Sequence, residues 1–151
     1  MPKQSAGILL YRYFNKQLQF LLVHPGGPFW AKKDIGAWSI PKGEFDGEEN
    51  ALDAAIREME EETSVKVAGD FIELSPVREK SGKVIHAFAL EMDVDVTNIE
   101  SNTFEMEWPP RSGKKKVIPE VDKAGWFDME TASVKIVPGQ LPLLEQLRAL
   151  L

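Results

Sequence analysis

Residues 43–65 read GEFDGEENALDAAIREMEEETSV, and this stretch carries the clearest helix signal of the 151-residue chain. Asn50 is a good N-cap, and Asp53 three residues later makes an imperfect capping box. Four apolar residues follow at the spacing i, i+3, i+4 and i+7: Leu52, Ala55, Ile56 and Met59. The pattern predicts a helix from residue 50 to about residue 63 that buries one apolar stripe.

Three carboxylates accompany that stripe. Glu58, Glu61 and Glu62 are spaced i, i+3 and i+4, so they project from one side of the helix within about one turn. Like charges this close repel one another unless a cation lies among them. Ala51 and Ala54 flank them and are expected to leave open space for an ion, its waters and a phosphate. Oxygen ligands with room for water favour Mg²⁺ or Mn²⁺ over zinc.

The fixed residues of the stretch resemble the Nudix box, G-x5-E-x7-R-E-U-x-E-E-x-G-U, in which U is aliphatic. The matching residues are Gly43, Glu49, Arg57, Glu58, Met59, Glu61, Glu62 and Val65. Ser64 departs from the pattern, because the family has a glycine there that caps the helix. A solvated acidic helix face is the alternative for an isolated glutamate run. Six fixed identities at this spacing, however, should arise by chance on the order of once in 10⁴ to 10⁵ sequences.

The sequence on either side of the box strengthens the resemblance. SAGILLYR at residues 5–12 resembles the first strand of the family. WSIPKGE at residues 38–44 resembles the W-x-x-P-K-G approach to the box in diadenosine polyphosphate and diphosphoinositol polyphosphate hydrolases. The resemblance implies an α/β (α+β) fold, an α/β/α sandwich with a mixed sheet, the box helix and a C-terminal helix. We expect a single domain over residues 1–151.

Other elements follow from periodicity and from proline and glycine punctuation. The expected extended segments are residues 5–14, 18–24, 38–41, 65–75, 84–93 and 124–127. Residues 24–37 are expected to form a loop, and Pro41, Lys42 and Gly43 a turn that approaches a ligand. Residues 96–119 form a long polar connection, interpreted as a lid, a dimer arm or a disordered segment. The spacing of the leucines in residues 140–151 predicts an amphipathic helix at the end of the chain.

The resemblance also implies roles in a metal site. Glu58, Glu61 and Glu62 are the expected ligands of Mg²⁺, for which Mn²⁺ is a substitute, and the Gly43 carbonyl is a further ligand. Glu58 and Glu61 are therefore also expected to be catalytic. Arg57, the third catalytic candidate on the helix, would orient and partly neutralise these carboxylates. Glu49 would brace the preceding loop onto the helix.

Family members often recruit one more acidic residue from a loop ahead of a late strand. Glu120, six residues before Trp126, is the candidate here, either as the catalytic base or as a further metal ligand. Glu105 and Glu107 are the competing candidates, and Asp122 is a weaker one.

Candidate substrate contacts lie ahead of the box. Lys42 is placed to touch a phosphate, and Trp30 with Lys33 offers base stacking beside a phosphate contact. The alternatives are a surface lysine and a tryptophan that packs its loop onto the body. Trp38 is interpreted as core or pocket wall, and both His24 and His86 as structural.

Composition bounds the function. The chain has no cysteine, which excludes disulfides, thiolate zinc sites and cysteine nucleophiles. Its net charge of −6 argues against duplex nucleic acid as a partner, although local lysines could still form a phosphate site. We find neither a signal-peptide pattern nor a stretch apolar enough for a membrane span, so we expect no membrane partner and a cytoplasmic location.

The resemblance predicts Mg²⁺-dependent hydrolysis of a phosphoanhydride bond in a nucleoside diphosphate linked to another group. Dinucleoside polyphosphates and nucleoside triphosphates are the leading small-molecule substrates. ADP-ribose, nucleotide sugars, diphosphoinositol polyphosphates and RNA 5′ ends stay open. The alternative is a non-catalytic nucleotide-binding or protein-interaction module. The oligomeric state is also open, with a homodimer as one possibility.

Overall fold

The computed structural model describes residues 3–151 and is built on a mixed sheet of seven strands. Its main path runs β4 (Ile72–Glu73), β6 (Val84–Glu91), β1 (Gln4–Phe14), β2 (Gln17–Pro25) and β9 (Val121–Asp128). Two short strands lie off this path: β3 (Lys42–Glu44) pairs with β1, and β5 (Val77–Arg78) pairs with β6. β1 and β6 are parallel, and all other pairs are antiparallel.

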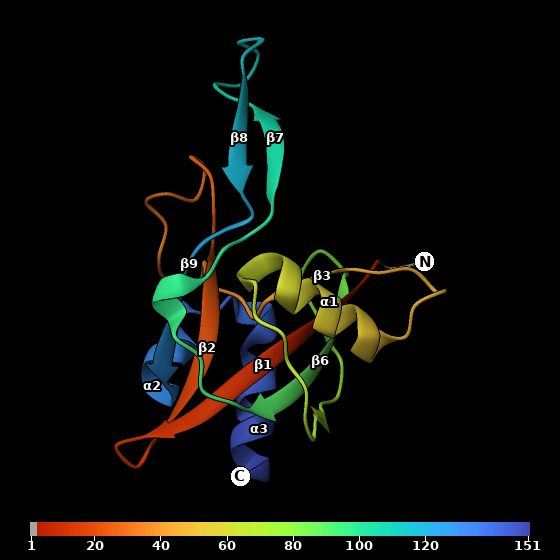
Figure 1. The fold of residues 1–151 in the computed structure, drawn as a ribbon, viewed down its shortest axis with the longest axis vertical. Helices are drawn as coiled ribbons and strands as arrows, with labels where there is room; N and C mark the ends of the chain where they lie inside the picture. The colour runs from red at the N-terminus through yellow and green to blue at the C-terminus, as the bar shows by residue number, and fades with distance from the viewer. Residues whose placement is uncertain (1–2) are drawn as a thin grey trace.

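Helices cover both faces of the sheet (Figure 1). α1 (Ala51–Thr63) packs on one face, and α2 (Met129–Lys135) with α3 (Leu141–Leu150) packs on the other. Two short 3₁₀ turns are also present: η1 (Val96–Asn98) follows β6, and η2 (Pro138–Gln140) lies between α2 and α3. The predicted three-layer architecture is confirmed. None of the helices in residues 3–151 combines the length and the apolar character that crossing a membrane requires.

The two faces explain the unbroken apolar run of the first strand. Ile8 and Leu10 enter the core under α1, whereas Leu9 and Tyr11 enter the core under α3. A strand that is buried on both faces needs apolar residues at consecutive positions rather than at alternate ones. The turn to β2 places Asn15 and Lys16 at positive φ, as a tight hairpin requires.

α1 begins where the sequence predicts. Asn50 accepts a hydrogen bond from the Asp53 N–H at 2.8 Å, which is an N-cap contact. The expected space beside Ala54 is absent, because Ala54 is fully buried in the core with Ala55 and Met59. The prediction that Ala54 leaves room for an ion is therefore wrong.

Three other local predictions need correction. Pro41, Lys42 and Gly43 do not form a turn, because Lys42 and Gly43 belong to β3 and pair with Gly7 and Ala6. Within residues 38–41 only isolated bridges form, at Trp38 and Ser39. Residues 65–75 contain only the two-residue β4, since Gly69 at φ +144° interrupts the extended chain.

The polar connection holds ordered structure. It contains η1 and a separate antiparallel hairpin of β7 (Thr103–Glu107) and β8 (Lys115–Pro119). This hairpin projects from one end of the body (Figure 1). The interpretation of residues 96–119 as disordered is therefore wrong.

Candidate metal and catalytic site

Two glutamates in the second half of α1 are buried. Glu58 and Glu62 lie one turn apart and are only 8% and 9% exposed, whereas Glu61 is half-buried and Glu60 is exposed. Glu58 lies directly against Gly43 of β3, where a Cβ atom would collide with the Glu58 carboxyl group. Glycine is thus required at this position to let the strand approach the helix.

Arg57 holds the neighbouring carboxylates in a network. Its Nε and Nη2 donate to the two carboxylate oxygens of Glu49 at 3.0 and 2.9 Å, a bidentate pair. Its Nη1 donates to Glu58 at 2.8 Å and to Glu61 at 3.2 Å. The expected orienting role of Arg57 and bracing role of Glu49 have the geometry that they need.

Glu62 has no such cation. Its Oε1 accepts a hydrogen bond from the backbone N–H of Lys42 at 3.2 Å, and no salt bridge within residues 3–151 involves it. Burial raises the pKa of Glu62 to about 8, with the negative charges of Glu120 and Glu58 adding to the effect and the Lys42 N–H opposing it. Burial likewise raises the pKa of Glu58, which Arg57 partly offsets.

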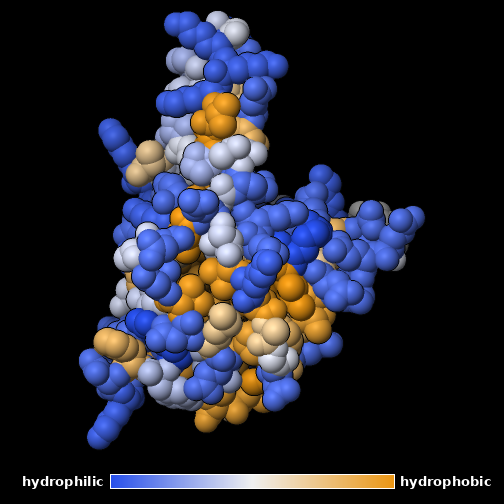
Figure 2. Space-filling model, viewed as in Figure 1, coloured by the Kyte–Doolittle hydropathy of each residue, from blue (hydrophilic) through white to orange (hydrophobic). Residues whose placement is uncertain are grey.

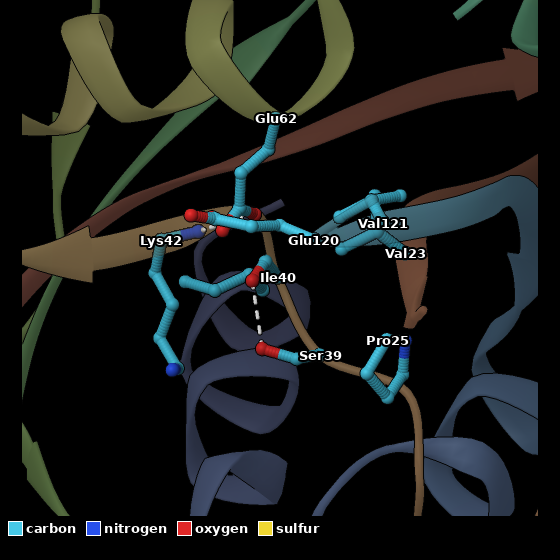
Figure 3. A pocket seen from close by; sticks show the side chains of 8 residues that line it. All are labelled: Val23, Pro25, Ser39, Ile40, Lys42, Glu62, Glu120 and Val121. Carbon is cyan, nitrogen blue, oxygen red and sulfur yellow. Dashed lines mark hydrogen bonds between the residues drawn. The ribbon is translucent and has the colours of Figure 1, made fainter. Parts of the chain in front are cut away.

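Glu62 opens onto a small pocket (Figure 3). Its carboxylate lies beside that of Glu120, and the Lys42 side chain extends away from both. The other lining residues are Val23, Pro25, Ser39, Ile40 and Val121. The cavity measures about 120 Å³, well below the roughly 300–1,000 Å³ of pockets that enclose whole small ligands. The space therefore has room for a small polar group rather than for a whole nucleotide.

Glu120 reaches the pocket from between β8 and β9. Its N–H donates to the Asn102 carbonyl and its carbonyl accepts from the Gly26 N–H, both at 3.0 Å. The competing acidic residues lie elsewhere: Glu105 and Glu107 are on the projecting hairpin, and Asp122 contacts His24 Nδ1 at 2.9 Å. The structure therefore brings Glu120 into the site, while its chemical role stays a prediction.

The other candidate substrate contacts lie outside this pocket. Trp30 is half-buried against the core, and Lys33 Nζ lies 4.1 Å from the centre of the Phe29 ring. Their role in substrate binding stays a prediction. Trp38 is buried in the core, which is one of the two positions predicted for it, and its indole N–H donates to Asp34.

Both histidines make contacts of the structural kind that the sequence suggested. His24 is buried between Asp122 and the carbonyl of Lys33. His86 contacts the Gln4 side chain at 2.5 Å.

Sequence reasoning missed Gln140, which supports the segment that leads to the site. This residue is fully buried, and its Oε1 accepts the Ile40 N–H at 3.0 Å while its Nε2 donates to Ser39. Its only local signal is a polar residue between two prolines, which does not reveal a partner 100 positions away.

The donor set suits a hard divalent cation. Its atoms are carboxylate oxygens, with Glu58 and Glu62 buried and Glu120 beside them, and such ligands match Mg²⁺ or Mn²⁺. In this arrangement of residues 3–151, no three Asp, Glu or His side chains are gathered closely enough to hold a metal. Instead, Arg57 donates hydrogen bonds to two of these carboxylates, Glu58 and Glu61.

Comparisons with known proteins point to one family. The NUDIX domain profile matches residues 1–147. Nudix hydrolase 6 of Arabidopsis thaliana is 33% identical over 101 residues, which are 65% of this chain and 30% of that protein. The m7GpppN-mRNA hydrolase of Saccharomyces cerevisiae is 28% identical over 135 residues, 88% of this chain and 11% of that protein. The chain thus spans less than a third of these relatives.

A shorter relative is the asymmetrical bis(5'-nucleosyl)-tetraphosphatase of Rattus norvegicus, 31% identical over 109 residues, or 64% of this chain and 70% of that protein. Among solved structures, the NUDIX domain of Shewanella oneidensis NrtR, complexed with ADP ribose, has a TM-score of 0.69 at 20% identity. It covers 99% of this chain and 88% of that one. A Caenorhabditis elegans Ap4A hydrolase binary complex has a TM-score of 0.67 at 21% identity, covering 98% and 96%. These structures support the fold.

Proposed function

The chain belongs to the Nudix family, and on that premise we propose that it is a Mg²⁺-dependent hydrolase of phosphoanhydride bonds. Its substrate is a nucleoside diphosphate linked to another group, with dinucleoside polyphosphates and nucleoside triphosphates as the leading classes. The similarity to the rat tetraphosphatase supports the dinucleoside class.

One observation carries the proposal: Glu62 and Glu120 meet in one pocket although they are 58 positions apart. Glu58 lies one turn from Glu62 on the same helix. Uncompensated carboxylates in a partly closed pocket are costly for the fold. A cation-dependent reaction gives a physical reason to keep them there.

The chain's own residues divide the work. Glu58, Glu61 and Glu62, with the Gly43 carbonyl, are the groups that would hold Mg²⁺, which supplies charge neutralisation on the phosphates when bound. Arg57 keeps Glu58 and Glu61 in place through its pair with Glu49. Lys42 lines the pocket and provides a cation for a phosphate oxygen. Glu120, half-buried at the pocket, accepts the proton of the attacking water.

The test is phosphate release from a substrate panel, measured with coupled pyrophosphatase or phosphatase, with Mg²⁺ and with EDTA. The panel holds nucleoside triphosphates, dinucleoside polyphosphates, ADP-ribose and nucleotide sugars. Metal-dependent turnover of one class supports the proposal and identifies the substrate. Saturable binding of the same compounds without turnover would instead support the non-catalytic module.

A further inference from the structure

The β7–β8 hairpin is tied to the site, although the proposed reaction makes no use of it. On its entering side, the Asn102 N–H donates to the Glu61 carbonyl at the end of α1, at 2.8 Å. On its leaving side, the chain passes directly into Glu120 of the pocket. The hairpin therefore begins beside the backbone of Glu61, ends at Glu120 and extends outward from these two candidate site residues (Figure 1).

Its charge is opposite to that of the body. Residues 103–119 contain four cationic and two anionic side chains, a net charge of +2, so the remainder of the chain carries −8. The cationic residues are Arg111, Lys114, Lys115 and Lys116, and all four are exposed. Figure 2 shows the end of the hairpin covered mainly by hydrophilic side chains. A local positive field on an acidic protein attracts anions to this segment.

The strand register separates the lysines between two faces. Pairing of Phe104 with Ile118 and of Met106 with Lys116 puts these four residues on one face. On the opposite face, Lys115 lies 4.0 Å from the carboxylate of Glu105. Lys116 forms no salt bridge within residues 3–151, so its charge is available to a ligand.

The face with Lys116 turns toward the loop of residues 26–37. Ile118 is 2% exposed, and a Cβ on Gly27 would lie 3.1 Å from its side chain. Phe104, directly opposite Ile118, is 42% exposed, and Lys116, nearer the tip of the hairpin, is exposed. An exposed aromatic ring beside an unpaired cation suits a ligand that combines bases with phosphates.

The distance to the pocket indicates which ligands reach this face. Lys116 precedes Glu120 by four residues, which in an extended strand is about 13 Å at about 3.3 Å per residue. A stacked nucleic acid rises about 3.4 Å per nucleotide along one strand, so about four stacked nucleotides span this distance. A ligand that occupies both the pocket and Lys116 must therefore extend about 13 Å, as successive nucleotides or a polyphosphate that ends in a nucleoside do.

We propose that the β7–β8 hairpin is a substrate arm, in which the face with Lys116 and Phe104 binds the extended phosphate chain of the substrate. The choice of substrate rests on the proposed hydrolase function, whereas binding by the arm does not. Two sources share this chemistry: a dinucleoside polyphosphate and the 5′-polyphosphorylated end of a single-stranded oligonucleotide.

Kinetics on a length series test the arm. We measure kcat/KM for three substrates: ATP, diadenosine tetraphosphate and a 5′-triphosphorylated oligoribonucleotide of eight residues. For each of the two longer substrates, the ratio of its kcat/KM to that of ATP is compared between wild type, Lys116→Ala and Lys115→Ala. We expect Lys116→Ala to lower the ratio about three- to fivefold through KM at low salt, the effect of losing one exposed ion pair. Lys115→Ala, on the opposite face, should keep the wild-type ratio. Equal ratios in all three proteins would overturn the arm, and the responding substrate identifies the source.

Direct binding separates failure of the arm from failure of the hydrolase proposal. Fluorescence anisotropy with labelled oligonucleotide is measured in EDTA over a salt series. Loss of the Lys116 contact should reduce the slope of log affinity against log salt by about 0.7. If the salt slope depends on Lys116 but no substrate is turned over, the arm proposal is supported and the hydrolase proposal is refuted. If substrate is turned over but Lys116→Ala changes neither the slope nor the kcat/KM ratios, the hydrolase proposal is supported and the arm proposal is refuted.

Discussion

The glutamates of α1 have the same side chain but differ in burial. Glu58 and Glu62 point under the helix and are nearly inaccessible, while Glu60 points to solvent. Because a buried carboxylate resists ionisation, the raised pKa of Glu62 reflects its side of the helix. In the role proposed for it, Glu62 would cost stability without a divalent cation and serve the reaction with one.

Glu62→Gln should lower kcat for the responding substrate by at least about a hundredfold, as loss of a metal ligand does. Glu60→Gln is the matched control, since Glu60 is exposed on the same helix. Steady-state kinetics with saturating Mg²⁺, together with circular dichroism, measure both variants. Wild-type turnover in a folded Glu62→Gln protein would contradict the assigned role.

The pH dependence of stability should have a defined sign in the metal-free protein. The pKa of Glu62 is raised in the folded state to about 8 from 4.5. Its contribution is therefore fully present below the unfolded value and is lost as the pH rises toward 8. Tm in EDTA should fall between pH 5 and pH 8, and Glu62→Gln should reduce the fall. An identical pH profile for wild type and variant would refute this assignment.

At the scale of elements, the end of α1 explains the departure from the Nudix box. Ser64 occupies the left-handed region with φ 65° and ψ 13°, where the family glycine has no Cβ to strain. Its N–H donates to the Glu60 carbonyl, and its hydroxyl donates to the Glu100 carbonyl at 2.6 Å. The serine thus exchanges backbone strain for a contact to the segment before β7.

Comparing two variants at this position isolates the strain. Ser64→Gly and Ser64→Ala both lose the hydroxyl contact, but only alanine keeps a Cβ in the left-handed conformation. We expect the glycine variant to be more stable than the alanine variant by about 1 kcal/mol. Urea unfolding measures the difference, and equal midpoints would show that the helix end relaxes in solution.

At the scale of the whole molecule, stability is unevenly distributed. β1 and β6 lie inside the sheet and contribute to the core on both faces. The β7–β8 hairpin forms its own two-stranded sheet and contributes mainly Ile118 to the buried residues. An isolated hairpin of this length is only marginally stable in water.

Amide hydrogen exchange should therefore distinguish the two regions. We expect amides of β7 and β8 to exchange at least about a hundredfold faster than those of β1 and β6, because local opening exposes them without global unfolding. Exchange followed by mass spectrometry with proteolysis measures this. Comparable protection in the free protein would mean that a partner, such as a second copy of the chain, covers the hairpin.

The resemblance and the helix were readable from residues 43–65 alone, because capping, helical periodicity and the i, i+4 spacing are local properties. The same local rules identified the strands of residues 5–14 and 84–93 and the closing helix, whose apolar patterns are strong. They identified the family as well, since the box is a spacing along the chain.

Only the tertiary structure decided which distant residues meet. Pairing of β2 with β9 and the path of the hairpin bring Glu120 to Glu62, and helix packing buries Ala54 where open space was expected. Local patterns also missed β5, α2 and the β7–β8 hairpin, whose short or polar segments carry weak periodicity. The sequence predicted the candidate ligand types, whereas the burial of these residues, their pKa values and the position of the β7–β8 hairpin depend on contacts between residues far apart in the chain.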